Sequence, residues 1–375
     1  MENDRQQQAK KYAKIHRILF VLDFCINGIW ALFWVISGFS NGLRTTISAF
    51  GFPVLVINAI FILIYGLSSI LVLFPLNYYS DFTLPKKYDL SNETFSTWLL
   101  DQFKSTILSG AIGLPILLII YWFLSIAPHT WWLWAAGFVF FASVLFANLY
   151  PVLIAPIFNK FTPLADDYAE LAEKLTQLAK SARTQVSGVF QYDMSRRSKT
   201  ANAALMGLGK SKRIVLSDTM IQNFTDDEIE TVLAHELGHH VHKDIPRSIA
   251  INSILIFASF YLASLGLNWG IKIFHFASIS DIATLPLLEI SFGIFSMLVF
   301  PIQNTFSRAL EKNADQFSLE LTRKPGAFAS ALTKLSDQNL AEMDPDPLFE
   351  FLLHSHPALG KRIRMAETFV VPADE

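Results

Sequence analysis

Cysteine is almost absent from this sequence, with Cys25 the only one in 375 residues. A single thiol excludes an internal disulfide framework and a thiolate-rich metal site. Any metal ion must therefore be held by histidine and carboxylate side chains.

Charge is also scarce, since charged residues make up 17% of the chain and the formal net charge is −2. That balance gives no support to nucleic-acid binding, and we expect none.

Apolar residues, by contrast, are abundant. They make up 52% of the chain, which includes 33 Phe and 8 Trp, and the mean hydropathy is +0.37. Runs long enough to cross a ~30 Å hydrocarbon core, which takes roughly 20 helical residues, occur at 17–39, 52–76, 105–127, 131–156, 248–267 and 286–306. We therefore predict an integral multi-pass membrane protein with six spans. The first run is too long for a removable signal peptide and lacks its cleavage site, so we expect it to be retained.

The distribution of basic residues predicts the orientation of the spans. The N-terminal tail and the loop after the second span are basic, through Arg5, Lys10, Lys11, Lys14 and Arg17, and through Lys86, Lys87 and Lys104. The alternate loops carry only Arg44, no basic residue, and Lys272. By the positive-inside rule, both termini and the long segment 157–247 face the cytoplasm.

The segment 157–247 has the composition of a soluble α+β unit. We expect a helix that begins at Thr162-Pro163 and runs to about Ala182, because threonine caps helices and proline suits their first turn. Short β-like runs follow at 186–192, 201–206 and 213–217, which predict a small sheet. Thr225 and Glu228 form a capping box that starts a second helix, which we expect to end near 244.

That second helix carries the residues His235, Glu236, Leu237, Gly238 and His239, which read H-E-x-x-H. Two histidines four residues apart on a helix project from one face and can chelate one small cation. Zn²⁺ accepts imidazole nitrogens and leaves room for a third protein ligand and a water. Glu236, beside that water, can accept its proton and deliver it to a leaving amine. The pattern predicts metal-assisted hydrolysis, most often of a peptide bond.

A third ligand is expected from a carboxylate on another helix. Glu311 is the best candidate, because it directly follows the last span on the same membrane face. Asp315 lies four residues further on, so on a helix over 307–321 it can hydrogen-bond the free ring nitrogen of a liganding histidine. The alternative for Glu311 is an ordinary solvated carboxylate at a helix end.

Five segments follow one another along the chain: IAPIFNKFTPL (154–164), SKTANAALMGLGKSKRIVLSDTM (198–220), TVLAHELGHHVHKD (231–244), SRALEKNADQFSLEL (307–321) and HSHPALGKRI (354–363). Together they resemble the type I CaaX prenyl endopeptidases, which are membrane-integral zinc metalloproteases. The resemblance implies a mainly α integral membrane fold, in which a multi-span helical barrel encloses a chamber. A zincin-like α+β metalloprotease domain closes the barrel on the cytoplasmic side. One Zn²⁺ per chain is implied, with His235, His239 and Glu311 as its ligands.

The resemblance also implies roles for residues outside the metal site. Asn202 and Ala203 fall on the pair that aligns the substrate backbone along an edge strand, as in strand addition. His356 and Arg362 fall on the donors that stabilise the oxyanion of the tetrahedral intermediate. His354 could replace His356 as a donor, although the register of the motif favours His356.

We expect spans 1–4 at 1–156, a catalytic domain at 157–247, spans 5–6 at 248–306, and the third ligand with a catalytic tail at 307–375. Eukaryotic relatives usually show seven spans, and this chain appears without the first one. That favours a prokaryotic cytoplasmic membrane with the site on its cytoplasmic side, or the endoplasmic reticulum membrane if the protein is eukaryotic. Expected partners are membrane lipid and a peptide or protein substrate, possibly lipidated, and we expect a monomer.

The predicted function is hydrolysis of peptide bonds, resembling removal of the C-terminal tripeptide of prenylated proteins. One alternative is an HtpX-like quality-control protease, which uses the same kind of site on damaged membrane proteins. A non-enzymatic alternative is a transporter or channel with a structural metal, which would have ionisable residues paired across spans.

Overall fold

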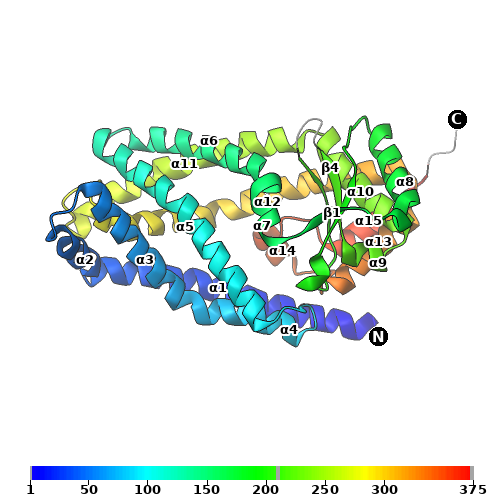
Figure 1. The fold of residues 1–375 in the computed structure, drawn as a ribbon, viewed down its shortest axis with the longest axis horizontal. Helices are drawn as coiled ribbons and strands as arrows, with labels where there is room; N and C mark the ends of the chain where they lie inside the picture. The colour runs from blue at the N-terminus through cyan, green and yellow to red at the C-terminus, as the bar shows by residue number, and fades with distance from the viewer. Residues whose placement is uncertain (1, 208–211, 372–375) are drawn as a thin grey trace.

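The computed structural model describes residues 2–207 and 212–371 (Figure 1). The N-terminal half is helical throughout: α1 (Glu2–Ile36), α2 (Phe39–Ser48), α3 (Val54–Asn77), α4 (Leu84–Lys87), α5 (Phe95–Ile126), α6 (Trp131–Leu149) and α7 (Ala155–Phe158). Two π-helical segments join them, η1 (Tyr78–Thr83) and η2 (Tyr150–Ile154).

The remainder alternates a small sheet with helices. Its strands are β1 (Phe161–Pro163), β2 (Val189–Tyr192), β3 (Ala203–Met206) and β4 (Arg213–Ser217). Its helices are α8 (Ala169–Ser181), α9 (Asp218–Asn223), α10 (Asp226–Val241), α11 (Asp244–Ile273), α12 (Leu285–Thr322), α13 (Pro325–Gln338), α14 (Pro347–Leu353) and α15 (Leu359–Glu367), with 3-10 turns at η3 (Asp166–Tyr168), η4 (Met194–Arg196) and η6 (Ile282–Thr284).

The six predicted spans are confirmed. In the described part of the chain, six helical stretches are long and apolar enough to cross a membrane: Asp4–Ile36, Val54–Lys87, Phe95–Ile126, Trp131–Phe158, Asp244–Ile273 and Ile282–Thr322. The first ends three residues earlier than predicted, because Gly38 adopts φ 73°. That left-handed conformation suits glycine and turns the chain into α2.

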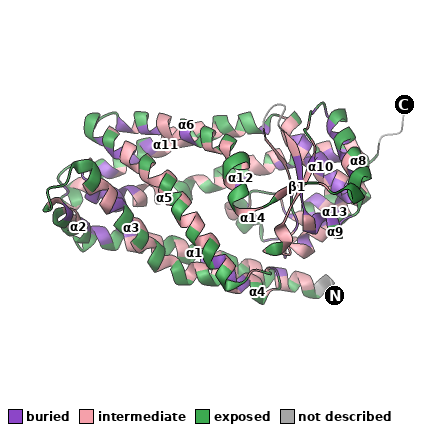
Figure 2. Ribbon diagram, in the orientation of Figure 1, coloured by how far each residue is buried: buried purple, intermediate pink, exposed green. Residues whose placement is uncertain are grey.

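The spans form a helical barrel whose buried side chains lie at its two ends. One hydrophobic core lies at the end away from the sheet, where it includes Trp34, Phe61 and Trp131, and a second lies within the sheet domain. Between these cores, residues 99–119 of α5, 245–259 of α11 and 289–303 of α12 contain no buried side chain. Figure 2 shows the buried residues of α12 at its two ends. The middle of these spans therefore has no fully buried side chain, although α11 and α12 still meet there through the hydrogen bond from Gln303 to Asn252 at 3.0 Å.

The sheet is mixed, in the order β1-β2-β4-β3. β2 runs parallel to β4, while β1 and β3 pair antiparallel with β2 and β4. Leu171 and Leu175 of α8 and Leu233 and Leu237 of α10 bury their side chains in the same core as the sheet. β3 is thus an edge strand, and it lies beside the helix that carries the H-E-x-x-H motif.

Two expectations about local structure are wrong. Thr162 and Pro163 do not begin a helix, because they form β1, where Thr162 pairs with Gln191; the helix starts only at Ala169. The segment 307–321 is not a separate helix either, since α12 continues without a break from the last span. The predicted strand over 213–217 is confirmed, and the other two are shorter than expected.

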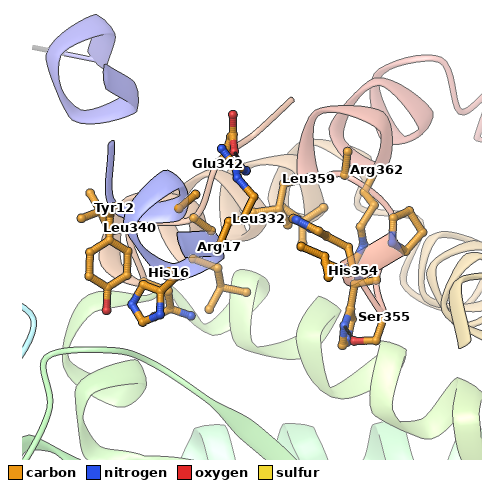
Figure 3. A pocket seen from close by; sticks show the side chains of 18 of the residues that line it. Tyr12, His16, Arg17, Leu332, Leu340, Glu342, His354, Ser355, Leu359 and Arg362 are labelled. Carbon is orange, nitrogen blue, oxygen red and sulfur yellow. Dashed lines mark hydrogen bonds and ion pairs between the residues drawn. The ribbon is translucent and has the colours of Figure 1, made fainter. Parts of the chain in front are cut away.

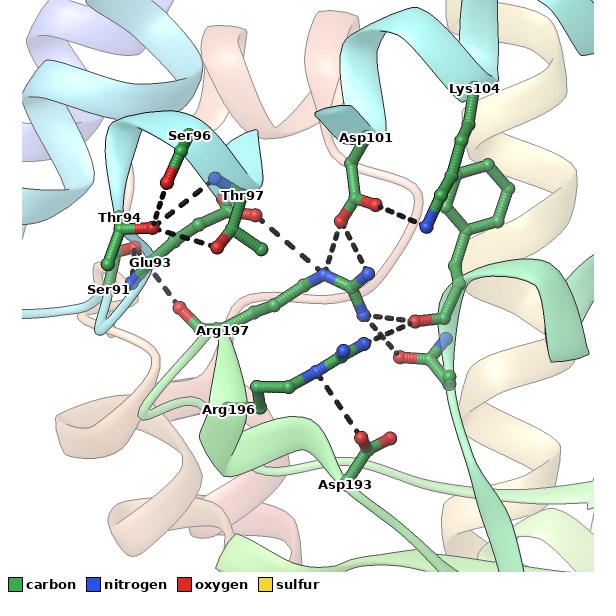
Figure 4. Close-up of polar contacts among 12 residues, drawn as sticks. Ser91, Glu93, Thr94, Ser96, Thr97, Asp101, Lys104, Asp193, Arg196 and Arg197 are labelled. Carbon is green, nitrogen blue, oxygen red and sulfur yellow. Dashed lines mark hydrogen bonds and ion pairs between the residues drawn. The ribbon is translucent and has the colours of Figure 1, made fainter. Parts of the chain in front are cut away.

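A polar junction fastens the third span to the sheet domain (Figure 4). The guanidinium of Arg197 donates to Asp101 of α5 at 2.6 Å and to the carbonyl of Phe158 at the end of α7. The backbone carbonyl of Arg197 accepts from the Asn92 amide at 3.0 Å. One side chain therefore joins three segments that are distant in sequence.

We expect Arg197→Ala to lower the free energy of unfolding by roughly 2–3 kcal/mol, because it removes the guanidinium that pairs with Asp101, a largely buried carboxylate that keeps Lys104 at 3.3 Å. Arg364→Ala is the matched control, since Arg364 and its ion-pair partner Asp344 are both exposed; we expect a cost below about 1 kcal/mol. Denaturation of both variants in detergent tests this. Equal losses would contradict the role of the junction.

Candidate metal centre

Helix α10 presents the motif as the sequence predicts. Its capping box is present, with the Thr225 amide donating to the Glu228 carboxylate at 2.7 Å. One turn separates His235 from His239, and their Nε2 atoms lie 3.2 Å apart. Two ring nitrogens directed at one point are the arrangement that a shared cation requires.

Helix α12 approaches this face of α10 unusually closely, at Gly238. A Cβ atom on Gly238 would lie 3.0 Å from the Cα atom of Ala314, tighter than ordinary van der Waals contact. One turn further along α12, the buried hydroxyl of Ser318 donates to the carbonyl of Thr231 at 2.7 Å. The missing side chain at Gly238 thus allows α12 to deliver its acidic residues to the histidines.

Glu311 completes the group. Its two carboxylate oxygens lie 3.3 Å from Nε2 of His235 and 3.3 Å from Nε2 of His239. The three side chains each offer a ligand atom, and these atoms lie within 4.8 Å of one another. The carboxylate of Glu311 is buried, and both of its oxygens face imidazole nitrogens. A buried carboxylate between two imidazoles fits a bound cation.

Two further carboxylates hold the histidine rings from behind. Asp315 lies 2.8 Å from Nδ1 of His235, and Asp244 lies 3.0 Å from Nδ1 of His239. Burial opposes protonation of His235, yet its hydrogen bonds to Asp315 and Glu311 raise its pKa to about 9. The surroundings therefore favour positive charge where the two rings meet.

Asp244 was missed by the sequence analysis. It lies five residues after His239, which is off the helical spacing, and it belongs to the next helix. Lys243 adopts φ 55° between the two helices and turns the chain back. In the sequence, Asp244 could be recognised only as an acidic residue in the first turn of a helix, which is a common feature and does not indicate a metal site.

Glu236 lies beside the metal group and faces a cavity of about 130 Å³, whose lining includes Ala203 and His356. Burial raises the pKa of Glu236 above its ordinary value, and the Glu311 charge adds to that, against the opposing charges of the histidines. A carboxylate with a raised pKa is a stronger proton acceptor. The geometry allows Glu236 to act as a general base.

The C-terminal tail brings His356 and Arg362 to the same cavity. His356 Nε2 lies 3.3 Å from Glu311. Arg362 binds Asp315 through two nitrogens, at 2.8 and 2.5 Å. Arg362 is buried. The carboxylate that it binds, Asp315, is the one that also hydrogen-bonds His235. Arg362 therefore supports the ligand sphere as well as lining the cavity.

Helix α12 also positions this tail. Asn304 donates to the carbonyl of Leu352 at 2.9 Å, and Arg308 donates to the carbonyl of His354 at 2.7 Å. His354 thus lies in a neighbouring cavity of about 750 Å³, which it shares with Arg17 and Glu342 (Figure 3). Of the two histidines, the structure brings His356 to the metal group.

Asn202 and Ala203 lie at the start of the edge strand β3. The backbone of Asn202 is turned toward β4, because its carbonyl accepts from the Ser217 amide at 2.9 Å and its amide donates to the Ser217 hydroxyl at 3.0 Å. Backbone groups alternate in direction along a strand, so the N–H and C=O of Ala203 point to the open edge.

Known proteins carry the same architecture. Residues 165–370 match the family described as Peptidase family M48, and residues 1–160 match the region described as CAAX prenyl protease N-terminal, five membrane helices. The chain belongs to peptidase family M48. All the candidate residues named above, from Asn202 to Arg362, lie within the first of these matches.

Individual relatives agree. The uncharacterized metalloprotease YhfN of Bacillus subtilis is 31% identical over 366 residues, which is 96% of this chain and 84% of that protein. A CAAX prenyl protease 1 homolog of Arabidopsis thaliana is 37% identical over 300 residues, covering 77% of this chain and 68% of its own. CAAX prenyl protease 1 of Saccharomyces cerevisiae is 35% identical over 317 residues, covering 79% and 68%.

A solved structure confirms the fold. The crystal structure of S. mikatae Ste24p matches with a TM-score of 0.86 and 27% identity, over 98% of this chain and 90% of that one. The predicted fold class is therefore confirmed, and the chain is a membrane-integral metalloendopeptidase with a peptide or protein substrate. The transporter alternative is excluded by this membership. Four of the six membrane-capable helices lie within residues 1–160, where the family description counts five.

We expect Gly238→Ala to separate α10 from α12, at a cost of about 1–3 kcal/mol in stability, and to reduce the amount of bound metal. Gly326→Ala is the matched control, because a Cβ atom at Gly326 of α13 meets no other atom within 4 Å. Metal content and thermal midpoint of the purified variants test this. Equal metal content in both would argue against the close approach as the determinant.

We expect Asp244→Ala to weaken metal affinity about 10–100-fold, because the ring of His239 loses the partner that orients it. Asp226→Ala serves as control, since Asp226 is an exposed carboxylate in the first turn of α10. Competition with a chelator measures both affinities. An unchanged affinity for Asp244→Ala would show that the ring is oriented by other contacts.

Proposed function

We propose that this protein is a zinc endopeptidase that removes a short C-terminal segment from prenylated proteins. The observation that carries the proposal is the convergence of His235, His239 and Glu311 within 4.8 Å, beside Glu236 and the open edge of β3. Two imidazoles and one carboxylate form a ligand set that zinc proteases use. The names of the relatives from Arabidopsis thaliana and Saccharomyces cerevisiae support the substrate class.

His235, His239 and Glu311 would hold the zinc ion, which would supply Lewis acidity and lower the pKa of a water molecule beside Glu236. Asp315 and Asp244 fix the tautomers of the two histidines, so that Nε2 of each ring faces the metal. Glu236 takes a proton from the attacking water and delivers it to the nitrogen of the leaving amine.

His356 and Arg362 supply the charge stabilisation that the tetrahedral intermediate needs. Both line the small cavity beside the metal group. Desolvation lowers the pKa of His356, and the charge of Arg362 acts in the same direction, so the neutral imidazole is favoured. Donors fixed in advance around a developing oxyanion are worth several kcal/mol of transition-state stabilisation.

Asn202 and Ala203 align the substrate. An extended peptide adds to the free edge of β3, where the outward N–H and C=O of Ala203 pair with its backbone. Strand addition uses backbone groups alone, which suits a protease that acts on many sequences.

An apolar cavity of about 420 Å³ lies between the end of β3 and the spans α6 and α11. Its lining includes Phe140, Val144, Leu205, Ile245 and Ile249. A prenyl chain on a cysteine bound along β3 fits this cavity, because its volume and lining are those of sites for apolar ligands.

The cellular setting follows from charge and composition. The basic loops support a metal centre on the cytoplasmic side of the membrane. That membrane is the prokaryotic cytoplasmic membrane, or the endoplasmic reticulum membrane if the protein is eukaryotic, and we propose that the protein acts there as a monomer among lipids. We propose that the chain works as four functional units with boundaries at 156, 247 and 306. Helices α11 and α12 run continuously across the last two boundaries.

A quality-control protease of the HtpX kind is the second candidate. The relative from Bacillus subtilis covers more of this chain than the relatives named for prenyl proteins, and its name gives a metalloprotease with no prenylated substrate. Such an enzyme would cleave peptides irrespective of a prenyl group.

We expect Glu236→Gln to retain zinc and to lose at least about 100-fold in the rate of peptide cleavage, because the proton acceptor is gone. The wild-type protein should cleave a farnesylated peptide that ends in a CaaX sequence and should cleave its unfarnesylated form much more slowly. Product masses and zinc content measure both effects.

Full activity of Glu236→Gln on the farnesylated peptide would overturn the assignment of the base. Equal cleavage of the two peptides by the wild-type protein would favour the quality-control function. Gln316→Ala is a suitable control, since Gln316 is exposed on α12 and hydrogen-bonds only Glu320 among the described residues.

A further inference from the structure

The open edge of β3 has a defined end. Residues at every second position face outward along this edge, and their partners differ. The amide of Lys199 donates to the carbonyl of Leu90 at 2.9 Å, in the loop after the second span. Ala201 comes next, and Ala203 follows as the first outward residue at which the edge is open.

Ala201 is held by a side chain instead of a strand. Its amide donates to Oδ1 of Asn339 at 3.0 Å, and its carbonyl accepts from Nδ2 of Asn339 at 3.4 Å. A side-chain amide that donates and accepts at one residue occupies both groups that a neighbouring strand would use. Asn339 follows the end of α13 and lies 138 residues away in sequence.

We propose that Asn339 ends the strand-pairing edge and so limits how many residues after the scissile bond can pair with β3. This inference rests on the proposed function, in which a prenylated peptide lies along β3. The apolar cavity for the prenyl chain adjoins the Met206 end of β3. The prenylated cysteine precedes the scissile bond, so the substrate runs antiparallel to β3 and its C-terminal residues run toward Ala201.

Beyond Asn339 a cavity can hold the leaving segment of the substrate, but no strand edge is there for its backbone to pair with. Asn339, Leu340, Ala341 and Glu342 line the cavity of about 750 Å³, into which Tyr12 and His16 of α1 project (Figure 3). This cavity adjoins the small catalytic cavity, since both are lined by Leu332, Leu335, His356 and Arg362. A short C-terminal segment ends here without further pairing, whereas a longer one must leave the extended conformation.

The test compares Asn339→Ala with the wild-type protein on farnesylated peptides that carry three, five or seven residues after the modified cysteine. The wild-type protein should prefer the shortest peptide. In Asn339→Ala the amide and carbonyl of the buried residue Ala201 lose their side-chain partner and become available to the substrate backbone. The kcat/KM for the five- and seven-residue peptides should then rise roughly three- to tenfold relative to the three-residue peptide, the worth of one added backbone hydrogen bond.

Asn223→Ala is the matched control, because Asn223 is an exposed asparagine whose amide donates to the Thr219 carbonyl at 2.7 Å. It should leave the order of preference unchanged. An unchanged order in Asn339→Ala, with the wild-type protein active on the three-residue peptide, overturns the role of Asn339 and leaves the proposed function standing. A wild-type protein that cleaves none of the farnesylated peptides overturns the proposed function and this inference with it.

Hydrogen exchange gives a readout that does not depend on turnover. In the Glu236→Gln background, the amide of Ala201 should be protected without peptide when Asn339 is present. In Glu236→Gln combined with Asn339→Ala, it should exchange rapidly and become protected on adding the seven-residue peptide. Protection that depends on neither the side chain nor the peptide overturns the proposal, even where Asn339→Ala lowers overall stability.

Discussion

The contact between Gly238 and Ala314 is the constraint on which the metal centre depends. The two histidines belong to a helix of the sheet domain, whereas Glu311 belongs to a helix that begins as a membrane span. Only close packing of these helices brings the three ligands together, and a Cβ atom at Gly238 would lie 3.0 Å from the Cα atom of Ala314, tighter than ordinary contact. Since α12 is continuous, its position is fixed both by the barrel and by the domain. The centre can therefore form only when both parts are assembled.

The sequence contained the features that are local. The capping box at Thr225, the four-residue spacing of the histidines and the long apolar runs each depend on neighbours along the chain, and each predicted its element correctly. Glu311 could be found because two acids at helical spacing directly follow a span, and the family resemblance pointed to the same residue. Asp244 and Asn339 could not be found, because their roles arise where separate elements meet. Thr162 and Pro163 show the same limit, since pairing with β2 overrode a favourable helix start.

The lack of buried side chains in the middle of α5, α11 and α12 could not be predicted from the sequence either. A span that faces lipid outside and a cavity inside is as apolar as one packed against its neighbours, so hydropathy does not distinguish them. Only the structure shows where the buried residues lie. One cluster, which includes Trp34, Phe61 and Trp131, is at one end of the barrel, and the other is in the sheet domain. Contacts between the spans and the sheet domain fix the position of the domain at the end of the barrel. The Arg197 junction between α5, α7 and the sheet domain is one such contact, and its charged side chains satisfy one another there.

An exposed strand edge is a hazard for most proteins, because any extended chain can pair with it. Here the residues that precede β3 are occupied by the carbonyl of Leu90 and by the side-chain amide of Asn339, and the edge of β3 itself begins at Ala203, beside the metal centre. Backbone pairing cannot discriminate between side chains, so selectivity for a substrate must come from where the edge starts and what flanks it. An apolar cavity adjoins the Met206 end and a wider cavity lies beyond Ala201. The residues before Ala203, which are already hydrogen-bonded, therefore set the register of the substrate, and the free edge of β3 binds its backbone.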